Sequence, residues 1–189
     1  LKKFQFSTSQ NYIIEMGNYY MRFFKDQGQI VVPNITASIT NGNFPSGISS
    51  WSDQSGGGSS ISHDATNDRL NLISNGTTNG HAEQTVTNSS AIEHVIQFQV
   101  IGAPGDYVFF RVGTSSTGTQ IVNDFIAEVG YHCYSFTATA ANFYVQFINE
   151  LGKTVQIDNV ALLDNVPVEL VTPYAEAHLY QIEGPQSAD

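Results

Sequence analysis

The ten residues EHVIQFQVIG, Glu93–Gly102, alternate between apolar and polar side chains in their central part. Every second residue from Ile96 to Val100 is apolar, and Gln97 and Gln99 lie between them. Successive side chains of a β-strand point to opposite faces of a sheet, so this spacing predicts a strand with one apolar face and one amide face. We therefore expect one strand of a half-buried sheet here.

Similar segments recur along the chain, separated by residues that favour turns. They read RLNLIS, HAEQTVT, YVFFRVGTS, IVNDFIAEV, HCYSFTAT, NFYVQFIN and TVQIDNVALL. The clearest alternations predict two further inward-facing sets, Val108, Phe110 and Val112, and Phe143, Val145 and Phe147. Short strands of fairly even spacing are typical of an all-β sandwich, whose core the apolar positions would build.

Composition narrows the choice of partners. The chain of 189 residues has 7 Lys and Arg against 17 Asp and Glu, which gives a formal net charge of −10. It therefore lacks the positive surface that binds nucleic acid or anionic membranes. No apolar run approaches the length that spans a bilayer. We expect no nucleic-acid partner and no membrane insertion. The single Cys133 lies in an alternating segment and is expected to be a small buried side chain.

The first 33 residues differ from the middle of the chain in composition, with more strongly apolar and aromatic segments. Two apolar-aromatic runs, Tyr12–Ile14 and Tyr19–Phe24, flank Gly17 and Asn18, which predicts a hairpin turning at that dipeptide. A third strand is expected at Ile30–Val32, ended by a proline. The chain then becomes rich in Ser, Thr, Asn and Gly. We expect a small sheet to precede the sandwich.

The middle of the chain resembles a family of jelly-roll carbohydrate-binding modules. The resemblance rests on an opening NGNFPSGISSW, an internal HAEQTV, FRVGTSSTG and YSFTAT, and a closing VQIDNVALLD. It covers about 130 residues and implies a jelly-roll β-sandwich over residues 34–164. The family also implies glycan binding on an aromatic and amide-bearing sheet face.

The two flanks resemble consecutive pieces of a large bacteriophage tail protein. The segments that carry this likeness are NYIIEMGNYYMRFFKDQGQIVV and PVELVTPYAEAHLYQIEGPQSAD. The resemblance implies that residues 1–33 and 165–189 form one small discontinuous β scaffold, with the jelly roll inserted between its strands. The junctions would be Pro33–Asn34 and Asp164–Asn165. Such an insertion requires the guest domain's ends to lie close together.

Glycan binding would need flat rings that stack on sugars and planar polar groups that bind hydroxyls. The residues that fit this description are Tyr107, Phe109, Arg111, Tyr144, Gln97, Gln99, Gln84 and Gln146. The alternative is that these side chains face a second packed layer or neighbouring subunits, because Tyr also suits strands. Trp51 is expected to be a core residue behind the NGNF segment.

The resemblance to carbohydrate-binding modules also implies a structural calcium ion between the opening segment, at Asn41, and Asp158 of the closing strand. Carboxylate and carbonyl oxygens suit this hard cation. However, the family's Glu after the Phe of the opening motif is replaced by Pro45. In the alternative, Asp158 hydrogen-bonds the turn beside Asn159.

No motif predicts catalysis. The five histidines lack metal-ligand spacing, and no P-loop, nucleophile elbow or dinucleotide fingerprint occurs. The hypothesis is a non-enzymatic virion component, part of a phage tail, that is homo-oligomeric and displays a module binding host surface glycan. Two alternatives remain: a purely architectural module that stabilises the tail, or a polysaccharide depolymerase.

Overall fold

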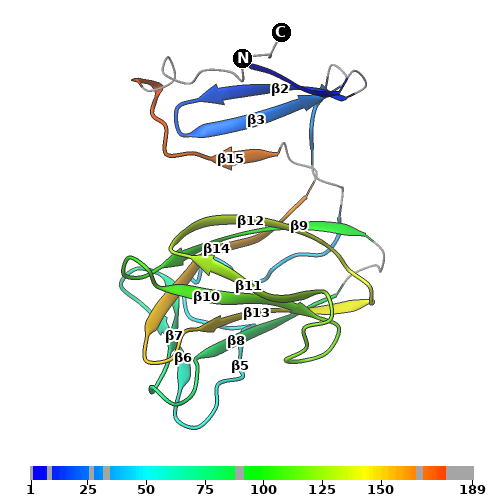
Figure 1. Ribbon diagram of the computed structural model, residues 1–189. Coiled ribbons are helices and arrows are strands. Elements are labelled where there is room, and N and C mark those ends of the chain that lie inside the picture. The colour runs from blue at the N-terminus through cyan, green and yellow to red at the C-terminus, as the bar shows by residue number, and fades with distance from the viewer. Residues whose placement is uncertain are drawn as a thin grey trace. The chain divides into compact units, whose positions relative to one another are not determined.

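The computed structural model describes residues 2–7, 10–25, 28–31, 35–87, 92–164 and 168–177. These residues form strands and turns without an α-helix (Figure 1), which confirms the all-β prediction. None of them belongs to a helix long and apolar enough to cross a bilayer. The chain divides into two compact units, Ile35–Asp164 and the combination of Leu1–Asn34 with Asn165–Asp189.

The unit made from the two ends of the chain is a small antiparallel sheet, called the flank sheet below. Its strands are β1 (Lys2–Ser7), β2 (Gln10–Gly17), β3 (Tyr20–Lys25), β4 (Gly28–Gln29) and β15 (Glu169–Val171). Their order is β1-β2-β3-β15, and β4 also pairs with β3. Figure 1 shows β3 between β2 and β15.

Strand β15 returns the chain to the sheet that it left after β4. Val171 lies opposite Tyr20 of β3, and the N–H of Thr172 donates to the carbonyl of Tyr19 at 2.9 Å. The other unit is therefore inserted between two strands of the flank sheet. The expected junction at Pro33–Asn34 lies outside the described residues, as does Asn165 of the second junction.

The turn between β2 and β3 differs from the prediction by one residue. Asn18 and Tyr19 form the turn, and Tyr19 rather than Gly17 or Asn18 has a positive φ, of 63°. Gly17 is instead the last residue of β2, where a Cβ atom would overlap the ring of Tyr20. A glycine is needed there because the ring approaches the backbone closely.

Residues 35–164 fold into two five-stranded antiparallel sheets (Figure 1). Sheet I has the order β11-β10-β13-β8-β5, and its strands are Val122–Glu128, Tyr107–Gly113, Asn142–Asn149, His81–Thr87 and Ser52–Asp53. Sheet II has the order β12-β9-β14-β7-β6, and its strands are Gly130–Thr137, Glu93–Ile101, Thr154–Leu163, Arg69–Ile73 and Ser60–Asp64. This arrangement confirms the predicted jelly-roll sandwich.

The core lies between the two sheets. Phe98 of sheet II contacts Phe110 and Phe147 of sheet I, with ring centroids 5.1 and 4.9 Å apart. The predicted inward sets are all fully buried, namely Ile96, Phe98 and Val100, Val108, Phe110 and Val112, and Phe143, Val145 and Phe147. The alternation therefore assigned the core face of three strands correctly.

The NGNF segment packs directly on the last strand of the sandwich. The N–H of Val160 donates to the carbonyl of Gly42 at 3.0 Å, and a Cβ at Gly42 would collide with the carbonyl oxygen of Val160. Phe44 is fully buried, and the Trp51 ring packs against it at 5.8 Å. Trp51 is a core residue, as expected, and its Nε1–H donates to the carbonyl of Asn41.

The prediction that Cys133 is buried is wrong. Cys133 is exposed on the outer face of sheet II, opposite Gln97 in the register of β12 with β9. The inward positions of β12 belong to His132, Tyr134 and Phe136, whose rings pack against core aromatics. Strand parity, rather than residue type, decides the position of the thiol.

Candidate functional site

The eight predicted carbohydrate-binding residues do not share one face. Five lie on the outer face of sheet I, and they are Tyr107, Phe109, Arg111, Tyr144 and Gln146. Gln97 and Gln99 lie on β9, on the outer face of sheet II. The prediction that they share one face is wrong. The two groups belong to different sheets, and the core of the sandwich lies between their outer faces.

Gln84 is an interior residue, which corrects its placement on a binding surface. It lies opposite the core residue Val145 and is 4% exposed. Its Oε1 accepts from the N–H of Thr40 at 2.7 Å, and its Nε2 donates to the carbonyl of Thr40 at 2.8 Å. Gln84 thus joins the opening segment to β8 and is almost completely shielded from solvent.

The outer face of sheet I has an apolar centre. Phe109 lies between Ile126 of β11 and Ile148 of β13 in the strand register. Tyr107 meets Phe109 edge to face, with ring centroids 5.3 Å apart. Ile126 is 54% exposed, and both rings are partly exposed. Tyr107, Phe109 and Ile126 form an accessible patch, called the aromatic platform below, and Ile148 beside it is buried.

A row of polar side chains borders the platform. Arg111 faces Gln146 of β13, and Gln146 faces Glu83 of β8. On the other side, Arg111 forms an ion pair with Asp124, from its Nε–H to Asp124 Oδ1. Asp124 has a φ of 49°, which residues other than glycine rarely adopt. Strained positions of this kind persist when the surroundings fix them, and they are common at binding sites.

The 114–121 loop covers the other end of this row, and Glu83 is its anchor. Glu83 Oε1 accepts from the Ser116 hydroxyl at 2.7 Å, and its Oε2 accepts from the N–H of Thr117 at 2.6 Å. Gln146 Nε2 donates to the carbonyl of Gly118 at 2.7 Å. Glu83 is 3% exposed and Gln146 is fully buried. The loop is therefore fixed against Glu83 and Gln146 at the end of the polar row.

His81 extends the buried cluster on the outer face of sheet I. Its Nε2 lies 3.1 Å from Gln146 Oε1. Because the Gln146 amide nitrogen already donates to the loop, its oxygen accepts from His81 Nε2–H. Burial lowers the pKa of His81 below its ordinary value, so the ring is neutral at pH 7. His81, Gln146 and Glu83 therefore hold the strands and the loop in place, and His81 adds no positive charge to the site.

Sequence reasoning missed Glu83 and chose its neighbour Gln84. In HAEQTVT the inward positions are Ala82, Gln84 and Val86, so Glu83 is the outward residue. The apolar residues Ala82 and Val86 did indicate which positions of this strand face inward. The indication was weakened because the inward residue between them, Gln84, is polar. In addition, Glu83 is buried by a loop that lies far away in the sequence.

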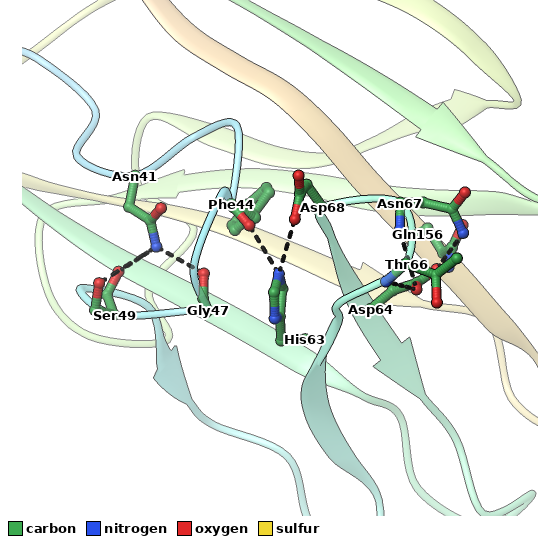
Figure 2. A network of polar contacts seen from close by, with 10 residues as sticks. All are labelled: Asn41, Phe44, Gly47, Ser49, His63, Asp64, Thr66, Asn67, Asp68 and Gln156. Carbon is green, nitrogen blue, oxygen red and sulfur yellow. Dashed lines mark hydrogen bonds and ion pairs between the residues drawn. The ribbon is translucent and has the colours of Figure 1, made fainter.

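The outer face of sheet II carries a separate network of amides. Gln156 Oε1 accepts from Arg69 Nη1 at 3.1 Å, and its Nε2 donates to Asp64 at 2.8 Å and to Asn71 at 2.9 Å. Asn159 Nδ2 donates to Gln99 Oε1 at 3.0 Å. Hydrogen bonds from Asn67, Gln156 and the turn backbone lower the pKa of Asp64 to about 2. Figure 2 shows Asp64 receiving these donors at the turn between β6 and β7.

The two predicted calcium ligands, Asn41 and Asp158, both form hydrogen bonds within the sandwich. Asn41 uses its Nδ2 to donate to the carbonyls of Gly47 and Ser49, at 2.9 and 3.0 Å (Figure 2). Asp158 Oδ1 accepts from the N–H of Asn159 at 2.7 Å, which is the alternative role considered for it. Among the described residues no group of three or more His, Cys, Asp or Glu is placed to hold a metal ion. Whether Asn41 and Asp158 hold a structural calcium ion stays a prediction.

Comparison with known proteins supports the class of the fold. No protein-family model and no curated protein matches the chain. Among solved structures, the apo form of CBM1 of BiXyn10A is 20% identical with a TM-score of 0.53, and the match covers 70% of this chain and 99% of that module. The chain thus contains a β-sandwich with the fold of a carbohydrate-binding module.

Two weaker structural likenesses were found. The K3 adhesin domain of Lys-gingipain from Porphyromonas gingivalis is 11% identical, with a TM-score of 0.45 and coverage of 68% of this chain and 99% of that domain. The enzymatically active domain of tailspike protein 4 of bacteriophage CBA120 is 14% identical, with a TM-score of 0.46 and coverage of 68% of this chain and 21% of that one.

Proposed function

We propose that residues 35–164 bind a neutral polysaccharide of the host cell surface through the outer face of sheet I. The observation that carries this proposal is the aromatic platform of Tyr107, Phe109 and Ile126 beside the partly exposed Arg111. Gln146, the neighbour of Arg111, is fully buried and supports this row without reaching a ligand, which corrects its predicted role in binding. Sugar rings present apolar C–H faces that stack on such groups, while their hydroxyls bind planar polar side chains. CBM1 of BiXyn10A, which shares the fold, is a carbohydrate-binding module by name.

The charges on this face favour a neutral ligand. The guanidinium of Arg111 is paired with Asp124, and Glu128 lies opposite Tyr107. Glu83 adds a buried carboxylate under the loop. An anionic sugar would meet the carboxylates of Asp124 and Glu128, and among the described residues of this face no unpaired cation compensates them. Donor groups of Arg111 that Asp124 does not use remain suited to sugar hydroxyls.

We further propose that the flank sheet belongs to a bacteriophage tail protein, which displays the sandwich on the virion in several copies. The support is the sequence resemblance of residues 1–33 and 165–189 to that family, together with the pairing of β15 with β3. The partners would then be other tail subunits, including copies of the same chain. Multiple copies raise avidity by orders of magnitude, so a weak single site suffices.

The proposed role is binding without catalysis. A glycosidase needs two carboxyl groups facing one another across the scissile bond. Glu83 instead holds the 114–121 loop, and Asp124 holds Arg111. The architectural module and the depolymerase remain the competing functions, and one experiment distinguishes all three.

The experiment is a glycan array probed with the full chain, its Phe109→Ala variant and a Tyr174→Ala control. Tyr174 is an exposed ring of the flank sheet unit, so its removal tests for nonspecific effects of losing an aromatic side chain. Binding that is lost in Phe109→Ala and kept in Tyr174→Ala supports the proposal. Absence of binding by the native chain overturns it in favour of architecture, and release of shortened sugar products favours the enzyme.

A further inference from the structure

The outer face of sheet II carries a second arrangement of ring and amides. Tyr131 of the edge strand β12 is 57% exposed and lies directly opposite Gln99 of β9. Two residues further along, Gln97 is also exposed on the same face. An exposed ring flanked by amides combines the two groups that neutral sugars require.

The amide next to Tyr131 is fixed by a bulge in the neighbouring strand. The register of β14 with β9 shifts between Asp158 and Ala161, and within this irregularity Asn159 has a φ of 54°. Asn159 Nδ2 donates to Gln99 Oε1 at 3.0 Å, so the Gln99 carboxamide is oriented before any ligand arrives. Bulges that redirect a side chain are over-represented beside functional sites, and a preoriented donor loses less entropy on binding.

Gln99 and Gln97 keep hydrogen-bonding groups that could bind sugar hydroxyls. Gln99 Nε2 and the whole Gln97 carboxamide have no hydrogen-bonded partner within the described part of the chain. Both oxygens of Asp158, which lies opposite Gln99 on β14, interact with Asn159. The carboxylate adds negative charge beside the amides, which disfavours an anionic ligand.

We infer that Tyr131, Gln99 and Gln97 form a second binding site for a neutral saccharide, on the face of the sandwich opposite the aromatic platform. The choice of ligand class rests on the proposed function, but the site itself uses different residues. Because the two core faces separate the sites, one sandwich could hold two polysaccharide chains simultaneously. The module would then cross-link glycan rather than only adhere to it.

The test measures stoichiometry per chain by titration calorimetry with cellohexaose, xylohexaose and mannohexaose as neutral probes. The chains compared are native, Phe109→Ala, Tyr131→Ala and the double variant. Ser135→Ala is a matched control, since Ser135 is exposed on the same face of the same strand. Tyr131→Phe keeps the ring and should retain binding. Circular dichroism spectra and melting temperatures verify that each variant is folded.

Two sites per native chain are expected, with one lost in each single variant and both in the double variant. Asn159→Ala should weaken the Tyr131 site about tenfold, the effect of losing roughly 1.4 kcal/mol of preorganisation. One site that disappears in Phe109→Ala and is unaffected in Tyr131→Ala overturns this inference and leaves the proposed function intact. One site that disappears only in Tyr131→Ala supports this inference and overturns the platform. No binding to any probe or array glycan overturns both.

Discussion

The Oδ1 atom of Asp164 accepts a hydrogen bond from the backbone N–H of Ile35 at 2.8 Å, and so joins the last residue of the sandwich unit to its first. A domain inserted into another must begin and end at nearby points. Here a side chain fastens those points together. The contact explains how a sandwich of this size interrupts the flank sheet without separating β15 from β3.

Asp164→Ala is expected to lower the stability of the sandwich. The mutation leaves the N–H of Ile35, a buried residue, without its acceptor, which costs about 1–3 kcal/mol. Thermal unfolding followed by circular dichroism measures the change. Asp164→Asn, which keeps an acceptor oxygen, is the control and should be closer to native. An alanine variant as stable as native would show that the contact does not fasten the unit.

Glu83→Ala is expected to free the 114–121 loop while the sheets stay folded. The substitution removes the carboxylate that accepts hydrogen bonds from the Ser116 hydroxyl and from the N–H of Thr117. Hydrogen bonds to a charged acceptor contribute about 1.5–3 kcal/mol each. Hydrogen exchange should therefore accelerate at Thr117. Glu128→Ala removes an exposed acid of the same sheet face as a control. Unchanged protection of Thr117 in Glu83→Ala would contradict the anchoring role.

Asp124→Asn is expected to change the charge selectivity of the sheet I face. It removes the carboxylate paired with Arg111, so an oligogalacturonate probe should bind several-fold more tightly than to the native chain. The gain should shrink in high salt because exposed charges are screened. Glu128→Gln removes one negative charge without touching Arg111. Equal gains in both variants would attribute the effect to net charge and not to the freed guanidinium.

Acid should destabilise the sandwich through His94. The ring is fully buried between Phe136 and Phe143, and its Nδ1 hydrogen-bonds the carbonyl of Ile92. Its Nε2 has no hydrogen-bonding partner among the residues that the structure describes. Burial lowers its pKa from the ordinary 6.5. The folded state therefore binds fewer protons than the unfolded state, so the stability contribution is present above pH 6.5 and is lost as the pH falls towards the folded pKa.

Denaturant unfolding between pH 7.5 and 5.5 measures this dependence. One proton accounts for at most about 1.4 kcal/mol per pH unit. His94→Phe should reduce the slope, and a smaller slope should persist because burial also lowers the pKa of His81. An identical slope in His94→Phe and native protein would exclude His94 as the source.

Strand parity was readable from local sequence where the inward positions were uniformly apolar. Ile96, Phe98 and Val100 are a clear example, and all three are fully buried. Parity failed for Glu83 and Gln84, where the inward residue is an amide satisfied by Thr40, a residue 44 positions away. Such a partner is invisible to any pattern within the strand.

The sequence by itself determined that this is an all-β chain and which side chains of its clearest strands point inward, because those properties depend on a two-residue period and on turn-forming residues. Only the tertiary structure decided which sheet each strand joins. Gln97 and Gln99 therefore lie on a different surface from Phe109, and the carboxylate of Glu83 lies beneath a loop. Pairing between distant strands depends on the packing of the whole core, which adjacent residues do not encode.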